Sequence, residues 1–211
     1  MRKLTRLLTF SILATAALTF TVSAQSSAAA TKEYNRLVAL ARSLKKINGD
    51  NMNREPHKSI LKRNEKDIVY SEPSGEWLVR SDRYWDLQKK YSKLAIAEEI
   101  AWTAANTSIP GECEGYAPCY VYAMRITDGE YLSLYPKGKY ARKAIDNLLA
   151  GFKPIIDDIK PAETYSGPGE GEERVDFKKH LDELTAIVKK TKQPKTATLL
   201  AQIKKLHDAY N

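Results

Sequence analysis

The chain has 211 residues, of which 43% are hydrophobic and 28% are charged, and its formal net charge is +8 at pH 7. This length suffices for one domain, or two small ones, with a buried core. After the first 24 residues no run of about 18 apolar residues occurs, which argues against a membrane-spanning helix in the rest of the chain. Lysines and glutamates are mixed along the chain and do not form long runs of like charge, as is typical of a solvated surface.

The first 24 residues have the pattern of a cleaved secretory signal. Three basic residues precede an apolar run over 7–22, and Val22-Ser23-Ala24 supplies the small residues that signal peptidase reads. An uncleaved anchor is the alternative, but the run is short for a membrane span. Cleavage would leave 31 Lys and Arg against 26 Asp and Glu, a balance of +5. We therefore expect a periplasmic or secreted protein with no nucleic-acid partner.

The next elements are a helix and a small β-hairpin. Residues 25–30 are small and polar and predict a disordered leader, after which Thr31 can cap an amphipathic helix that reaches about Leu44. A short helix follows Pro56. The β-prone triplets at 68–70 and 77–79 flank a turn-forming tetrad, which predicts a hairpin near 68–80.

A broad apolar stripe then predicts one long helix from Ser81 to about Asn106, with Glu98 and Glu99 facing out. Pro118 is well placed to begin the next helix, which is apolar on most sides, reaches about 135 and should be central.

The C-terminal part is also predicted to be helical. Apolar residues between 140 and 152 recur with helical spacing. The glycine-rich and acidic segment 161–174 predicts a flexible loop, and 175–211 predicts a helical hairpin broken at Gln193-Pro194. The expected architecture is mainly α, with one main helical domain over 31–160 and the hairpin packed on it.

Two cysteines occur, Cys113 and Cys119. In an oxidising compartment such a close pair favours a disulfide, which closes a loop of 7 residues and stabilises the fold by about 2.4 kcal/mol in the chain-entropy model. A redox pair or a metal site is the alternative. Redox motifs favour two intervening residues rather than five, and no histidine is nearby to complete a zinc site.

The cysteine loop also carries the candidate binding residues Glu112, Glu114 and Tyr116. Carboxylates two residues apart in an extended segment face the same way and could serve acid–base chemistry or hold a cation. The alternative is a solvated turn. Tyr116, expected to be exposed on the loop, could contact a peptide or glycan. The sequence has no HExxH motif, no GxSxG motif and no phosphate-binding glycine loop, so we expect no cofactor, metal site or catalytic residue.

The stretch from Gly129 to Ala144 contains Tyr135-Pro136 followed by Ala141 and Ala144. It resembles the junction between helices in tetratricopeptide-like proteins of bacterial envelopes, where an aromatic-proline step ends one helix and small residues let the next approach closely. The resemblance covers about one helical pair, and no second copy at a period of about 34 residues is visible. It implies antiparallel helical hairpins in a right-handed array and a role in binding other proteins, but it implies no ligand.

These observations predict an exported protein-binding or scaffold module whose partner is another envelope protein or a peptide. One alternative is a module that adsorbs to anionic wall polymers or lipid surfaces, because a balance of +5 gives a weak attraction to them. A hydrolase that uses Glu112 and Glu114 is a further, less favoured alternative.

Overall fold

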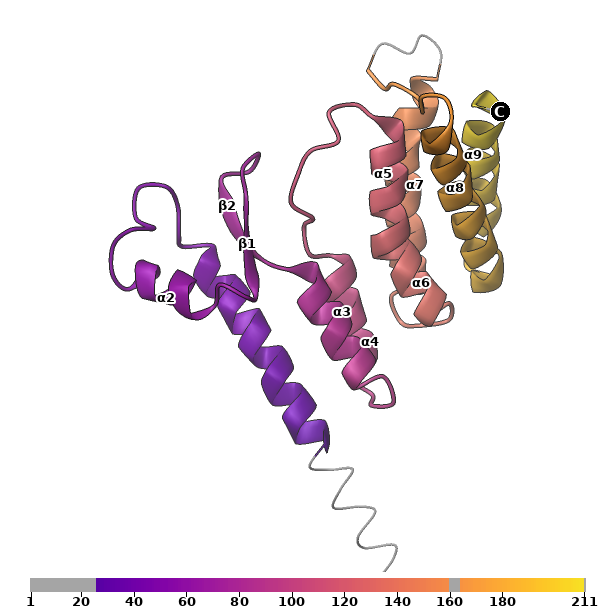
Figure 1. The fold of residues 1–211 in the computed structure, drawn as a ribbon. Coiled ribbons are helices and arrows are strands. Elements are labelled where there is room, and N and C mark those ends of the chain that lie inside the picture. Colours follow the sequence, from indigo (N-terminus) through magenta and orange to yellow (C-terminus); the bar gives the residue numbers. More distant parts are fainter. Residues whose placement is uncertain (1–25, 160–163, 211) are drawn as a thin grey trace, which may run out of the picture.

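The computed structural model describes residues 26–159 and 164–210 and is mainly helical, with one small antiparallel β-hairpin (Figure 1). This confirms the predicted mainly α class with a hairpin near 68–80. The predicted signal segment, 1–24, lies outside the described residues. The elements in chain order are a helix over 26–44, α2 (His57–Arg63), β1 (Ile68–Ser71), β2 (Glu76–Val79), α3 (Ser81–Lys90), α4 (Ala97–Ala105), α5 (Ala117–Met124), the π-helical segment η1 (Arg125–Gly129), α6 (Glu130–Leu134), α7 (Ala141–Asp157), α8 (Glu172–Thr191) and α9 (Thr196–Ala209).

The first helix begins earlier than the sequence indicated. Residues 26–30, expected to be a disordered leader, form its first turn. Three consecutive alanines (28–30) explain this difference, because alanine has the highest helix propensity and Ala30 is fully buried. None of the helices in the described ranges combines the length and the apolar character that crossing a bilayer requires.

The predicted long helix over 81–106 is wrong. Residues 91–96 break it, and α3 and α4 pack against each other as a helical hairpin (Figure 1). The apolar stripe was broad because it combines the faces of two helices. Tyr84 and Leu87 of α3 enter an N-terminal core, whereas Trp102 of α4 enters a C-terminal one. Folding back lets both stripes be buried.

The N-terminal core lies between the first helix, the β-hairpin and the α3–α4 pair. Ile68 and Val79, paired in register across the hairpin, are both buried there. This contact supports a two-stranded sheet that would be marginal alone. Helix α4 joins the two cores because Ile100 and Ala104 face this one, whereas Ala101 and Trp102 face the other.

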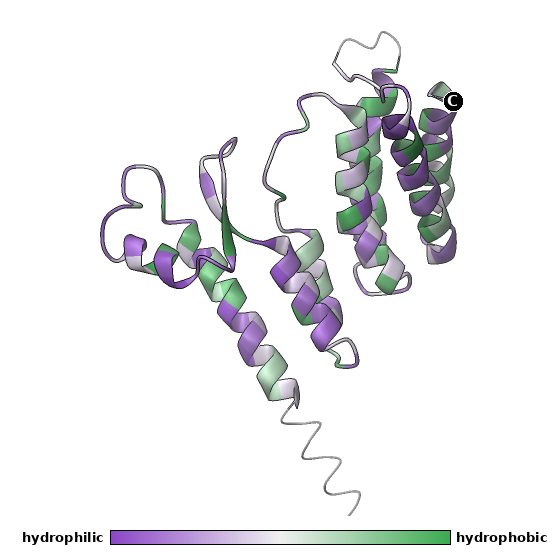
Figure 2. Ribbon diagram, in the orientation of Figure 1, coloured by the Kyte–Doolittle hydropathy of each residue, from purple (hydrophilic) through white to green (hydrophobic). Residues whose placement is uncertain are grey.

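The C-terminal core lies inside a ring of four helical rods. The continuous rod α5–η1–α6 packs against α7 and α8, and α9 packs against both of these, so that each rod contacts two others (Figure 1). Apolar and hydrophilic residues both occur along these rods (Figure 2), and the buried residues among them are mostly apolar. Fully buried large side chains fill the centre, among them Phe152, Phe177, Leu181 and Leu184.

The sequence predicted that Glu98 and Glu99 face solvent. In the structure both carboxylates also form hydrogen bonds that link α4 to α6 and to the segment between α6 and α7. The Oε1 atom of Glu98 accepts hydrogen bonds from the Tyr131 hydroxyl at 2.7 Å and from the Lys139 N–H at 2.6 Å. Glu99 accepts from the Lys139 ammonium at 2.6 Å and from the Tyr140 hydroxyl at 2.8 Å, and the first of these bonds lowers the pKa of Glu99 most. We call these hydrogen bonds of Glu98 and Glu99 the joint. Because α4 contributes residues to both cores, the joint helps to connect them.

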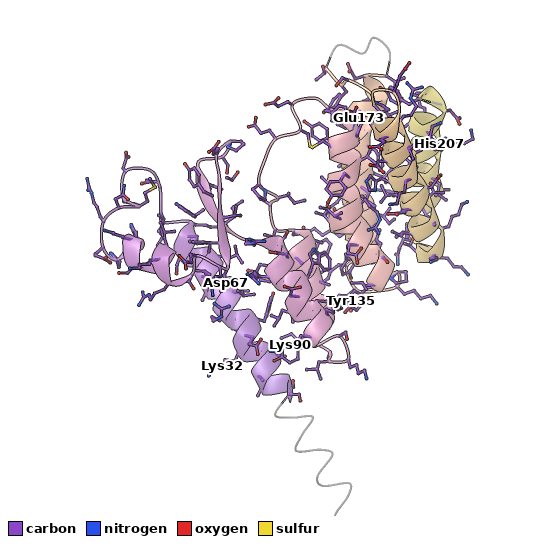
Figure 3. All side chains as sticks on the ribbon, in the orientation of Figure 1. Lys32, Asp67, Lys90, Tyr135, Glu173 and His207 are labelled. Carbon is purple, nitrogen blue, oxygen red and sulfur yellow. A yellow bond between two sulfur atoms is a disulfide. The ribbon has the colours of Figure 1, made fainter. Side chains whose placement is uncertain are left out.

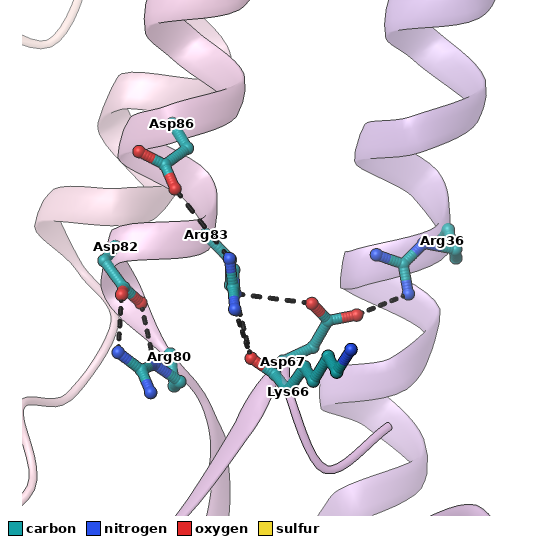
Figure 4. A network of polar contacts seen from close by, with 7 residues as sticks. All are labelled: Arg36, Lys66, Asp67, Arg80, Asp82, Arg83 and Asp86. Atoms are coloured by element: carbon teal, nitrogen blue, oxygen red, sulfur yellow. Dashed lines mark hydrogen bonds and ion pairs between the residues drawn. The ribbon is translucent and has the colours of Figure 1, made fainter. Parts of the chain in front are cut away.

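A second polar network connects the first helix, the start of the hairpin and α3 (Figure 4). Asp67 lies between two arginines: its Oδ2 accepts from Arg36 at 2.8 Å, and its Oδ1 lies 3.4 Å from Nε of Arg83. Arg83 also donates to the Lys66 carbonyl at 2.6 Å and 3.0 Å. Asp67 is 21% exposed, so solvent screens these pairs only in part.

We expect Asp67→Asn to lower the free energy of unfolding by about 1 kcal/mol, because two partly exposed ion pairs are lost. Urea denaturation at low and high salt measures this, and the loss should shrink at high salt. Asp50→Asn, at an exposed position whose side chain makes no hydrogen bond or ion pair within the described ranges, is the matched control. Equal stability of both variants would contradict the assignment.

Candidate functional site

The predicted disulfide between Cys113 and Cys119 is present, with a Cα–Cα distance of 5.4 Å. It ties the loop that follows α4 to the first turn of α5. The same loop is fastened to the segment before α8, because the Ser166 N–H donates to the Gly115 carbonyl and the Ala117 N–H donates to the Ser166 carbonyl, both at 2.9 Å. The loop over 106–116 is therefore anchored at its C-terminal end.

We expect Cys113→Ser with Cys119→Ser to lower the free energy of unfolding by up to about 2.4 kcal/mol, the loop-closure entropy of the lost link. Urea denaturation of the oxidised protein, the reduced protein and the double variant measures the effect. The reduced protein and the variant should agree with each other. An oxidised protein no more stable than either would refute the stabilising role.

Tyr116, which the sequence offered as a possible contact residue on the loop, is partly buried and bonded to α8. Its hydroxyl donates to Glu173 at 2.7 Å. Glu173 lies near the start of α8 (Figure 3). This hydrogen bond raises the pKa of Tyr116 and is the largest cause of the lowered pKa of Glu173. The Gly169 N–H donates to the same carboxylate at 3.1 Å. Tyr116 thus fastens the loop to the start of α8.

An extended groove runs along the disulfide loop, α5 and α3. One part, of about 870 Å³, lies between the loop and α5, and another, of about 650 Å³, lies between α3 and the η1–α6 segment. Ile109, Tyr122 and Thr127 line both parts, so the two are continuous. A smaller hollow of about 490 Å³ extends the groove toward β1 and shares Glu112 and Glu114 with the first part. We call this surface the loop groove.

Exposed apolar side chains gather in the loop groove. Ile109 is 37% exposed, Tyr122 49% and Leu134 43%. Trp85 and Ile126, both partly buried, lie between them along the wall. Large exposed apolar residues concentrated in one concave surface are typical of an interaction site, whereas isolated ones carry no such meaning.

The rim of the loop groove is acidic, although the whole chain is basic. Its only lining cation within the described residues is Lys89. The lining acids are Glu72, Asp82, Asp86, Glu112, Glu114 and Glu130. Asp82 pairs with Arg80 at 2.7 Å and Glu130 with Arg125 at 2.9 Å. Glu72, Glu112 and Glu114 make no side-chain hydrogen bond or ion pair within 26–159 and 164–210 and are exposed.

Both predicted carboxylates, Glu112 and Glu114, therefore belong to this surface. No group of three or more His, Cys, Asp or Glu side chains in the described part of the chain is arranged to hold a metal ion. The apolar side chains of the groove were not predicted, because Tyr122 and Leu134 lie in helices whose pattern predicted burial. The unusually apolar circumference of the 117–134 rod was the available signal, since a helix at the edge of a ring cannot bury every side.

One carboxyl group lies behind the groove, in η1. Asp128 accepts a hydrogen bond from the Asn147 side-chain amide of α7 at 3.1 Å. Burial raises the pKa of Asp128 to about 7, against smaller lowering effects of Asn147 and Lys143. The extra residue of the π-helical turn widens the rod here, and the Thr127 hydroxyl donates to the Ala123 carbonyl at 2.7 Å. Asp128 does not line the groove.

No protein-family model, curated protein or solved structure matches this chain. The interpretation of the loop groove therefore rests on its own geometry and charge.

Proposed function

We propose that the protein is a binding module of the cell envelope whose loop groove holds a segment of a partner protein, and that it has no catalytic activity of its own. The observation that carries this proposal is the gathering of Ile109, Tyr122 and Leu134, all more than a third exposed, along one groove. Covering such side chains supplies the hydrophobic part of a binding free energy.

The acidic rim indicates the kind of segment. Glu112 and Glu114 have no ion-pair partner within the described ranges, so a lysine or arginine of the partner could pair with them without breaking an existing contact. The partner segment should therefore combine apolar anchors with basic residues. We also propose a periplasmic or secreted location, which the disulfide supports because such bonds persist in oxidising compartments.

The helical hairpins support a scaffold of the tetratricopeptide-like kind as part of the same proposal. Helices α3 and α4 pack as one hairpin, and α8 and α9 as another. The alternative is adsorption to anionic wall polymers or lipid, which would use the basic exterior rather than the acidic loop groove.

The proposal is tested by fluorescence anisotropy with a labelled peptide of about ten alternating lysines and leucines. We expect saturable binding that Tyr122→Ser weakens about tenfold, because the apolar area of this ring no longer covers the peptide. Val175→Ser removes another exposed apolar side chain, 66% exposed and outside the groove, and should leave binding unchanged.

The charge is tested with Glu112→Gln combined with Glu114→Gln, which should weaken binding and reduce its salt dependence. A peptide of alternating glutamates and leucines should not bind. Equal effects of Tyr122→Ser and Val175→Ser, or equal binding of both peptides, would refute the proposal. Salt-sensitive binding to anionic vesicles that is unaffected by all of these substitutions would favour the adsorption alternative.

A further inference from the structure

A separate cavity lies between α4 and the N-terminal elements of the chain. It has a volume of about 740 Å³ and is lined by the first helix, β2 and the C-terminal end of α4. Cavities of about 300–1,000 Å³ are typical of small-molecule sites. It shares only 106–108 with the loop groove, so the two sites lie on either side of this short segment.

The cavity wall is largely apolar and aromatic. The lining aliphatic residues are Val38, Ala41, Leu44, Ile47, Leu78 and Val79, and the lining aromatic residues are Trp77, Tyr84 and Trp102. The indole Nε1 of Trp77 is buried and has no hydrogen-bond partner within the described residues. A buried indole N–H usually has an acceptor, so this unpaired donor is unusual among the described residues.

The mouth of the cavity is cationic. Arg42 and Lys45 lie one turn apart on the first helix and its end, are exposed, and form no ion pair within 26–159 and 164–210. Residues three apart on a helix share a face, so both charges can reach one group. Glu76 is the only lining acid within the described residues, and Asn106 and Ser108 add uncharged polar groups. The charge at this cavity is therefore opposite to that of the loop groove.

We propose that this cavity binds a small apolar anion, namely a hydrophobic or aromatic body that carries one carboxylate or sulfonate. The acid group pairs with Arg42 and Lys45 at the mouth, and the body lies against Trp77 and the aliphatic wall. A charged group paired with an exposed arginine keeps its hydration in part, whereas the body loses its contact with water. This site is independent of the loop groove and does not require the function proposed for it.

The test titrates the purified protein with 1-anilinonaphthalene-8-sulfonate and then displaces it with decanoate. We expect one saturable site, energy transfer from tryptophan to the probe, and displacement by decanoate at a concentration at least tenfold below that needed with decanol or decyltrimethylammonium. If decanoate, decanol and decyltrimethylammonium displaced the probe at similar concentrations, the site would select only for hydrophobicity, and the proposal would be overturned. The absence of saturable binding would overturn it as well.

Two variants locate the site. Arg42→Gln with Lys45→Gln should weaken decanoate binding at least tenfold, and Lys46→Gln with Lys58→Gln, two exposed lysines outside the cavity, should not. Ala41→Leu fills the cavity and should abolish binding without removing a charge. Circular dichroism and urea denaturation verify that each variant is folded. Unchanged binding in both folded cavity variants would place the probe elsewhere and refute the inference.

Discussion

Replacing Gly138 by alanine should destabilise the protein by about 3 kcal/mol, because the new methyl group would displace the hydrogen bonds that join α4 to the segment between α6 and α7. A Cβ atom at position 138 would lie 2.6 Å from the Tyr131 hydroxyl oxygen, still nearer to Oε1 of Glu98, and 2.9 Å from the Cβ of Tyr135. Tyr131 is fully buried, so its hydroxyl has no water to replace the lost acceptor.

Urea denaturation with a far-UV signal measures this loss. Gly49→Ala is the matched control, because a Cβ atom there meets nothing within 4 Å. It should leave the free energy of unfolding nearly unchanged. If Gly138→Ala proved as harmless as Gly49→Ala, the joint would not hold the two cores together, and the positions of Glu98 and Tyr131 would have to be revised.

The second large effect is a pH dependence of the free energy of unfolding that is caused by Asp128. Its pKa is raised to about 7 by burial, above the ordinary value of 3.8. Between about pH 4 and pH 7 the folded protein therefore keeps a proton that the unfolded chain has lost. The contribution of Asp128 to the free energy of unfolding is therefore highest below pH 4. It decreases as the pH rises to about 7 and does not change further above pH 7.

Asp128→Asn should remove this loss and be more stable than the parent at pH 8 by on the order of 2 kcal/mol, since one pKa unit corresponds to about 1.36 kcal/mol and partial exposure discounts the full shift. The difference should vanish at pH 4. Urea denaturation at pH 4, 6 and 8 measures it, with exposed Asp176→Asn as the control. A variant that gains nothing at pH 8 would show that Asp128 is solvated in the folded protein.

Features determined by neighbouring residues could be predicted from the sequence. The disulfide follows from two cysteines six positions apart, and the hairpin from a turn between two β-prone triplets. The split of 81–106 could not be predicted, because the turn at 91–96 contains no glycine or proline, and only packing against two cores reveals it. The roles of Glu98 and Glu99 were missed because their partners are about 40 positions away.

The candidate site was predicted only in its charged part. Glu112 and Glu114 lie in the loop groove. The apolar residues that complete the groove, such as Leu134 at the end of α6, are distant from them in the sequence. Tyr116 was a possible contact residue on the loop, and its hydrogen bond to Glu173, 57 positions away at the start of α8, could not be predicted from its own segment. Periodicity identifies which residues are apolar but does not show which of them the ring of helices leaves uncovered.

The central claim is that the loop groove holds a basic and apolar segment of a partner. Its most direct test is an NMR titration of the ¹⁵N-labelled protein with the lysine–leucine peptide. We predict that the largest amide chemical-shift changes occur at Ile109, Tyr122 and Leu134, and that the amide chemical shifts of α9 do not change. Shift changes confined to α9 and other surfaces outside the groove, or none at peptide saturation, would contradict the claim.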